Sequence, residues 1–185
     1  GYSGLLDQIG TQGGTPAMPN FQIGDLLGGS LTALVGILAA IVDARASGHG
    51  RYVDVSMTDA VFAHTLFPLL AVLGLGHALP RGEDLLSGGL PCYGVYPTSD
   101  GRHFAVGALE PKFWQLLCET IGRPDLKPCA YLMGSEGLRI RRELEAIFVQ
   151  RSFAEWTVVF DKAVCCVTPV LRFEESLANE QLQAR

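Results

Sequence analysis

The chain has 185 residues, of which 48% are apolar and 18% are charged. This balance excludes intrinsic disorder and fits one domain or part of a larger one. The formal net charge is −5 and no long run of one sign occurs, which argues against a nucleic-acid groove and a polybasic membrane patch.

The first 24 residues are rich in Gly, Pro, Gln and Thr. They predict a loop with one helical turn at Leu5–Ile9. The chain has no initiator methionine and no signal-peptide pattern at its start, and it stops within a polar helical pattern. We therefore expect it to be a fragment of a longer protein.

Two apolar segments follow, separated by an alternating one. The small and aliphatic residues of Leu26–Val42 predict a helix that Ser47–Gly50 ends, and Arg51–Met57 alternates as a strand does. Thr58 and Asp59 can cap a second helix over Ala60–Leu75, with a kink or break at Pro68.

These apolar segments also suit a transmembrane hairpin. The first is about 17 residues long, whereas roughly 20 are needed to span a bilayer. The second contains Pro68 and His64, and His77 follows it. We therefore favour buried helices of a soluble α/β protein, in which both histidines take core or satisfied polar positions.

The second half of the chain shows clear local signals. The polar, Gly-rich segment 80–90 predicts a linker between domains, and Asp100-Gly101 predicts the turn of a β-hairpin. Pro169 places the last strand at a sheet edge. The expected elements are strands Tyr93–Pro97, His103–Val106 and Cys166–Leu171, helices Pro111–Thr120, Glu136–Gln150 and Phe153–Asp161 with a Ser152–Glu155 capping box, and a polar helix from Phe173.

Three features could carry chemistry. Asp25 precedes an apolar helix whose first turn holds Gly28 and Gly29, so a ligand could approach the backbone there. Ser87-Gly88-Gly89 could form a lid, and Glu110 lies where a strand passes into a helix. Simple caps and a plain linker remain the alternative explanations.

Other common sites have no signature in this sequence. The five cysteines are odd in number, two are adjacent, and none has zinc-ligand spacing. We expect reduced, mostly buried thiols and no metal. No phosphate-binding loop or nucleophile elbow occurs.

Taken in order, several motifs resemble the class III CoA-transferase superfamily, which includes formyl-CoA transferases, carnitine CoA-transferases and 2-methylacyl-CoA racemases. The match covers nearly the whole chain and is specific for the family but not for the reaction. The motifs are Gly24-Asp25 with Gly28-Gly29, Gly36–Ala40, Ser47–Met57, Pro80-Arg81-Gly82, Leu86–Gly89, Val106–Trp114 and Val167–Leu171.

The resemblance implies an α/β fold with two domains in each subunit and two interlocked subunits in a homodimer. Residues 1–79 would be the rear part of a large, Rossmann-like CoA-binding domain. Residues 80–90 would be the linker, and 91–185 a smaller α+β domain. The front of the large domain, which supplies most CoA contacts in the family, would lie outside this chain.

The resemblance also implies a role for each candidate residue. Asp25 matches the catalytic aspartate that attacks an acyl-CoA thioester in the transferases. Gly88 and Gly89 match the glycine-rich loop that covers the thioester. In the racemases the same aspartate exchanges an α-proton with a histidine, which here would lie before Gly1, and Glu110 matches a glutamate that supports this histidine.

The prediction from sequence is therefore a cytoplasmic acyl-CoA enzyme without a tightly bound cofactor, for which coenzyme A thioesters and small carboxylic acids are substrates. CoA transfer through Asp25 is narrowly favoured. Racemisation of a 2-methylacyl-CoA is the main alternative, and an inactive fragment or dimerisation module is the alternative of another class. The sequence names neither the acyl group nor the acceptor.

Overall fold

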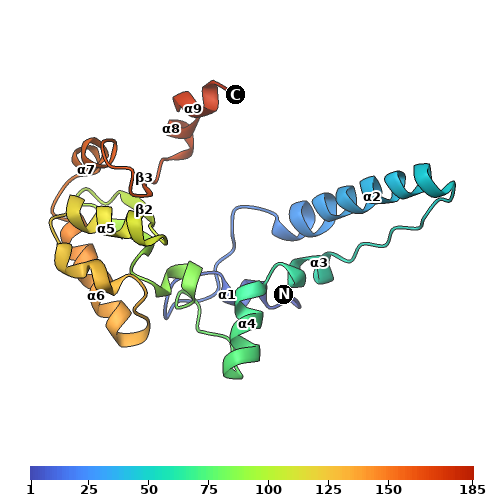
Figure 1. The fold of residues 1–185 in the computed structure, drawn as a ribbon, viewed down its shortest axis with the longest axis horizontal. Coiled ribbons are helices and arrows are strands. Elements are labelled where there is room, and N and C mark those ends of the chain that lie inside the picture. The colour runs from blue at the N-terminus through green and yellow to red at the C-terminus, as the bar shows by residue number, and fades with distance from the viewer. The chain divides into compact units, whose positions relative to one another are not determined.

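The computed structural model describes residues 1–185 and divides into two compact units, Gly1–Asp84 and Leu85–Arg185 (Figure 1). The division falls inside segment 80–90. Unit 1 contains helices joined by loops and has no strand. Its elements are α1 (Leu5–Gln8), the π-helix η1 (Ile23–Leu31), α2 (Thr32–Ser47), α3 (Met57–Ala63) and α4 (Leu66–Leu75).

The first long helix of unit 1 starts earlier than the sequence predicts. It begins at Ile23 rather than Leu26, so Gln22 takes the N-cap position and Asp25 lies within the first turn. The predicted stop is confirmed, because Gly48 adopts a left-handed conformation with φ of 77° and its N–H donates to the Ala44 carbonyl.

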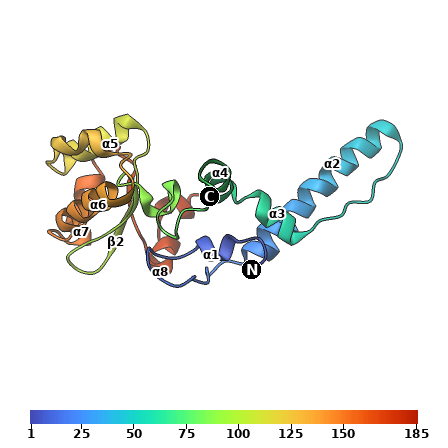
Figure 2. The ribbon, with the colours of Figure 1, turned by 90° about the horizontal axis from the view of Figure 1, so that it is seen from below.

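The prediction that Arg51–Met57 is a β-strand is wrong, because this segment pairs with no other strand. The segment is extended, and Val53 and Val55 are less exposed than their neighbours. Figures 1 and 2 show it returning alongside α2 towards α3. A Cβ atom on Gly36 of α2 would lie 2.9 Å from the Val53 Cγ1, so this glycine allows the two segments to approach closely.

The second predicted helix is two helices. The axes of α3 and α4 differ by 65° at the break. The break lies at His64 and Thr65 rather than at Pro68. Pro68 has no N–H to donate to the carbonyl of His64, four residues earlier, and its ring crowds that carbonyl, so the helix is interrupted there. Ser56 caps α3 in place of Thr58, since its hydroxyl accepts the N–H of Asp59.

The apolar helices are largely exposed within this chain, contrary to the prediction that they are buried. No residue of α2 or α4 is fully buried. His64 and His77 are exposed and not in the core, but each ring has the polar partner that the sequence analysis allowed for: the His64 Nδ1 lies 2.7 Å from the Ala60 carbonyl and the His77 Nδ1 3.2 Å from the Leu75 carbonyl. By length and composition the continuous helix Ile23–Ser47 could cross a membrane, as core helices of soluble proteins also could.

Glycine allows η1 to pack directly on α3. Gly28 is buried, and a Cβ atom there would lie 2.8 Å from the Val61 Cγ2 and 2.9 Å from the Met57 carbonyl oxygen. The neighbouring Gly29 has more room, since its Cβ would lie 3.4 Å from the Met57 side chain. The contact between these two helices therefore requires glycine at position 28.

Unit 2 contains the only sheet, whose three strands lie in the order β1-β2-β3. The predicted hairpin is confirmed: β1 (Tyr93–Pro97) pairs antiparallel with β2 (His103–Gly107), with Tyr93 opposite Gly107. Gly101 in the turn has φ of 72°. As Pro169 predicts, β3 (Val167–Pro169) is an edge strand, antiparallel to β2.

Helices and turns complete unit 2. Pro111–Thr120 and the Ser152–Glu155 capping box are confirmed, and the second predicted helix starts and ends two residues earlier than expected. The predicted polar terminal helix is two short helices. The elements are the turn η2 (Leu85–Gly89), α5 (Pro111–Thr120), η3 (Pro124–Cys129), α6 (Gly134–Phe148), α7 (Phe153–Phe160), α8 (Phe173–Leu177) and α9 (Glu180–Gln183).

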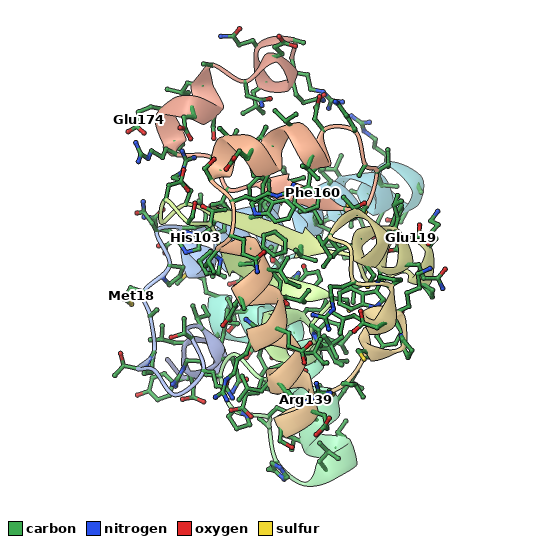
Figure 3. The ribbon with its side chains drawn as sticks, turned by 90° about the vertical axis from the view of Figure 1, so that its left-hand side faces the viewer. Met18, His103, Glu119, Arg139, Phe160 and Glu174 are labelled. Atoms are coloured by element: carbon green, nitrogen blue, oxygen red, sulfur yellow. The ribbon has the colours of Figure 1, made fainter.

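Aromatic rings dominate the core of unit 2. Phe148 at the end of α6 is fully buried and stacks on Tyr96 of β1, with the ring centroids 5.2 Å apart. Trp156 and Phe160 of α7 also contact Phe148, and Phe104 of β2 contacts both Phe148 and Phe160. Figure 3 labels Phe160. Each large ring removes apolar area from water, so this cluster joins the sheet to α6 and α7.

We predict that Gly28→Ala destabilises the protein by roughly 1–3 kcal/mol, because the added methyl group meets a backbone carbonyl that cannot move alone. Gly74→Ala in α4 is the matched control, since a Cβ there meets nothing within 4 Å. The control should be neutral or more stable by up to about 1 kcal/mol. Thermal unfolding followed by circular dichroism would measure both, and equal effects would contradict the packing role of Gly28.

Candidate active site

Asp25 lies in the first turn of η1 and is exposed. The alternative explanation as an N-cap is wrong, because Gln22 holds that position. The Asp25 carboxylate makes no hydrogen bond or ion pair in the structure, so it has no evident structural task. A nine-residue π-helix is rare, and such turns often occur at functional sites.

A cavity of about 440 Å³ lies beside Asp25, entirely within unit 1. Asp25 is the only carboxylate among the residues that line it. Most of the other lining side chains are apolar, and they come from the N-terminal segment, the start of η1 and α3. They include Leu5, Leu6, Ile9, Met18, Phe21, Ile23, Met57 and Val61.

Arg81 holds the N-terminal wall of this cavity in place. Its guanidinium donates to the Asp7 carbonyl over 2.6 Å, to the Gly14 carbonyl over 2.5 Å and to the Asp7 carboxylate over 2.8 Å. The Arg81 side chain is only 15% exposed, whereas the Asp7 side chain is 71% exposed, so the guanidinium is shielded but the carboxylate stays open to solvent. The loop between α1 and η1 is therefore anchored to the last residues of unit 1.

The predicted glycine pair has a structural explanation that the sequence did not show. Gly28 is needed for contact with α3, as described above, and Gly29 lies against Met57. A direct contact of these glycines with a coenzyme remains a prediction. Their effect on Asp25 is indirect, because they fix the turn that carries it.

Glu110 belongs to unit 2 and takes the N-cap position of α5. Its carbonyl accepts the Phe113 N–H over 2.9 Å, but its carboxylate makes no capping hydrogen bond. The main-chain carbonyl of Glu110 therefore makes the capping bond, and the exposed carboxylate has no structural task. Glutamate is also not among the preferred N-cap residues.

The predicted loop residues Ser87, Gly88 and Gly89 form the C-terminal part of η2, also in unit 2. Gly88 has φ of 115° and ψ of 4°, which only glycine adopts readily. The structure therefore groups Asp25 with Gly28 and Gly29 in unit 1. Glu110 and the η2 loop lie in unit 2.

Three of the five cysteines are buried and are poor nucleophiles, whereas Cys129 is partly exposed and Cys166 is exposed. Burial raises the pKa of the Cys92 thiol to about 11 and that of Cys118 to about 12, so both are protonated at neutral pH. Cys165 is also buried, and burial raises its pKa as well. No group of His, Cys, Asp and Glu side chains could hold a metal ion.

Sequence reasoning gave no role to two arginines that organise these parts. They are Arg81 in unit 1, which was named only within the Pro80-Arg81-Gly82 motif, and Arg141 on α6 in unit 2. Both make their key contacts with backbone carbonyls. A backbone carbonyl has no sequence signature, so only the folded structure identifies such partners.

Comparison with known proteins identifies the family of this chain. Residues 1–185 match the model of CoA-transferase family III. The human alpha-methylacyl-CoA racemase is 35% identical over 185 residues, which are 99% of this chain and 48% of that protein. A succinyl-CoA:mesaconate CoA-transferase from Haloarcula marismortui is 30% identical over 158 residues, covering 85% of this chain and 38% of that protein.

Solved structures share the fold. A CAIB/BAIF family protein from Brucella suis aligns with a TM-score of 0.73 at 18% identity, covering 100% of this chain and 49% of that one. The chain spans about half the length of the curated relatives it matches. With the family model matched from the first residue to the last, this chain belongs to CoA-transferase family III.

Proposed function

We propose that the protein containing this chain is an acyl-CoA enzyme that exchanges the α-proton of a 2-methylacyl-CoA, with Asp25 as one of its two acid–base groups. The observation that carries the proposal is the unengaged Asp25 carboxylate at an apolar cavity. Support also comes from the racemases of mouse and human, which align with 99% of the chain at 34% and 35% identity.

The chemistry required of Asp25 is modest. A thioester acidifies the proton on its α-carbon, so a carboxylate within hydrogen-bond reach can remove it. The resulting enolate is then protonated on its other face by a second group. The apolar side chains around Asp25 suit the hydrocarbon part of an acyl chain, and the cavity volume of about 440 Å³ lies within the usual range for small-molecule sites.

Glu110 has a supporting role in this proposal. The family resemblance assigns the second acid–base group to a histidine outside this chain, with Glu110 as its partner. A carboxylate that accepts a histidine N–H fixes the ring orientation and favours its charged form. The exposed Glu110 carboxylate, which makes no capping bond, is available for that contact.

CoA transfer, which the sequence narrowly favoured, is the second candidate. Asp25 would attack the thioester carbonyl, releasing CoA and forming a mixed anhydride. The CoA thiolate would then attack the Asp25 carbonyl, free the first acid and form an aspartyl-CoA thioester. An acceptor acid would finally take CoA through a second anhydride. The relative from Haloarcula marismortui named as a CoA-transferase favours this candidate.

A purely structural role, the remaining alternative, is less well supported. It gives no reason for an unengaged carboxylate beside a cavity or for a second one at Glu110. A cytoplasmic location and the absence of a tightly bound cofactor stay predictions.

We also propose that the intact protein is a homodimer. Apolar side chains of α2 such as Leu38 and Val42 are 53% and 68% exposed in this chain. Leaving a large apolar surface in water is costly. A second subunit, interlocked as the family resemblance implies, would cover part of it.

Light scattering on the intact protein should therefore give the mass of a dimer. Leu38→Glu should weaken the dimer, because it would bury a charge. Val164→Glu in unit 2, where Val164 is 80% exposed, is the control and should leave the mass unchanged. A stable, active monomer would refute the proposal.

Asp25→Asn should lower turnover by a factor of about 100 to 10 000, because an amide neither accepts the proton nor acts as a nucleophile. Stability should change by about 1 kcal/mol or less, since only a helix-dipole contact is lost. Asp43→Asn is the matched control: Asp43 is an exposed residue of α2 that pairs with Arg51 at 2.6 Å. Near-normal turnover of Asp25→Asn would overturn the proposed function.

Two measurements on the intact wild type separate the candidate reactions. In deuterated water, incorporation of deuterium at the α-carbon indicates proton exchange. Transfer predicts instead that CoA reaches an added carboxylic acid and that hydroxylamine traps a covalent intermediate at Asp25, which mass spectrometry would locate. Turnover with α-deuteration and without labelling of Asp25 is the result we expect.

Glu110→Gln should slow α-proton exchange by lowering kcat, with little change in KM, because Glu110 acts through the second acid–base group and not through substrate binding. Glu119→Gln is the control, since Glu119 lies on the same helix and pairs with Lys127 at 2.6 Å on the surface. An unchanged exchange rate, or an effect on KM alone, would reduce Glu110 to a helix cap.

A further inference from the structure

Arg141 lies on α6 and contacts the η2 loop. Its Nη1 donates a hydrogen bond to the Gly88 carbonyl, 53 residues away in sequence. Glu145 lies four positions later on the same helix, where it could form an ion pair with Arg141. The structure contains no Arg141–Glu145 ion pair, and the guanidinium reaches the loop instead.

The surroundings of Arg141 fit this contact. A Cβ atom on Gly94 of β1 would lie 3.2 Å from the Arg141 Nη1, so glycine there leaves room for the guanidinium. On another side the guanidinium carbon lies 5.7 Å from the centre of the Tyr96 ring, within the range of a cation–π contact. The side chain is half-buried between the strand, the ring and the loop.

Further contacts hold the C-terminal end of the loop. The Tyr96 hydroxyl donates to the Pro91 carbonyl over 2.5 Å, and Leu90 is buried. Gly137 of α6 lets the loop approach closely, because a Cβ atom there would lie 3.3 Å from the Gly89 carbonyl oxygen as well as against Leu132. The end of the loop is thus fixed independently of Arg141, whereas Leu85 and Leu86 are exposed.

Gly88 has a backbone conformation that only glycine adopts readily. Its φ of 115° lies outside the helical range of the residues around it. Glycine has many alternative conformations of similar energy, so a hydrogen bond to its carbonyl can decide which one is populated. A bond from a charged donor is about twice as strong as a neutral one.

We propose that Arg141 is a positioning residue for the glycine-rich loop, and that its bond to the Gly88 carbonyl holds Ser87-Gly88-Gly89 in one conformation. The family resemblance assigns the covering of the reacting thioester to this loop. The inference rests on the proposed acyl-CoA chemistry, and in it Arg141 acts through the loop backbone.

Hydrogen exchange of the intact protein, read by mass spectrometry over residues 85–90, tests the contact without any substrate. Arg141→Gln should speed exchange of these amides by about tenfold or more, as expected for loss of a hydrogen bond from a charged group. Gly94→Val should act in the same direction, because its side chain displaces the guanidinium. Arg141→Lys should retain part of the protection.

Arg142→Gln is the matched control, since Arg142 is the next residue of α6 and is exposed. It should leave exchange over residues 85–90 unchanged. Unchanged exchange in Arg141→Gln, or an equal increase in Arg142→Gln, would overturn the proposal. This readout needs no turnover, so it can be separated from a failure of the proposed function. If the proposed acyl-CoA function is wrong, the wild type will be inactive on acyl-CoA while exchange of its loop amides still depends on Arg141.

A second readout tests the link to chemistry. Arg141→Gln should lower kcat more than it raises KM, and should increase the fraction of acyl-CoA lost to hydrolysis, because water reaches the thioester when the loop is not held. Arg142→Gln should match the wild type in both respects. Faster loop exchange with unchanged kcat and unchanged hydrolysis would refute the shielding role.

Discussion

The candidate site depends on one close contact, that of Gly28 in η1 with the backbone and Val61 side chain of α3. Because no side chain separates the helices there, the π-helical turn of η1 lies directly on Met57 and Val61. These two residues also line the cavity. Asp25 is one turn earlier on the same helix. Its position relative to the cavity wall is thus set by helix packing, and its own carboxylate takes no part in holding it.

Unit 2 could be predicted well because its signals are local. Asp100-Gly101 fixes a turn through its own backbone preferences, Ser152 and Glu155 satisfy each other across one helical turn, and Pro169 excludes a central strand position. Each of these preferences acts within a few residues. The structure confirms the hairpin, the capping box and the edge strand without help from distant contacts.

Unit 1 could be predicted only in part, because its structure depends on partners that its own sequence does not supply. Arg51–Met57 has the alternation of a strand, but pairing requires a neighbour, and the chain provides none. The helices α2 and α4 have core composition, yet no residue of either is fully buried in this chain. The start of η1 was misjudged by three residues, since the widened turn has no sequence pattern of its own.

For the site, the sequence and the family resemblance together singled out Asp25 and Glu110. The structure removes the cap explanation for Asp25, whereas Glu110 does occupy the N-cap position of α5. Asp25 does not cap its helix, and the Glu110 carboxylate makes no cap bond. The roles of the two arginines were not predictable. Arg81 lies in a turn and binds backbone carbonyls, and an arginine on an amphipathic helix, such as Arg141, usually signals only solvation. What distinguishes Arg141 is the loop carbonyl that it reaches from α6.

The way Arg81 binds the N-terminal loop has a consequence for how this cavity can diversify. Two of its three bonds go to the main-chain carbonyls of Asp7 and Gly14, and every residue type presents a carbonyl. The anchorage therefore needs glycine at position 10, where a Cβ atom would lie 2.5 Å from the Arg81 Cδ, but its two bonds to carbonyls do not depend on the side chains of α1. Leu5, Leu6 and Ile9 can be exchanged for larger or smaller residues while the wall stays attached, so related proteins can reshape this chamber by point substitution without rebuilding its support.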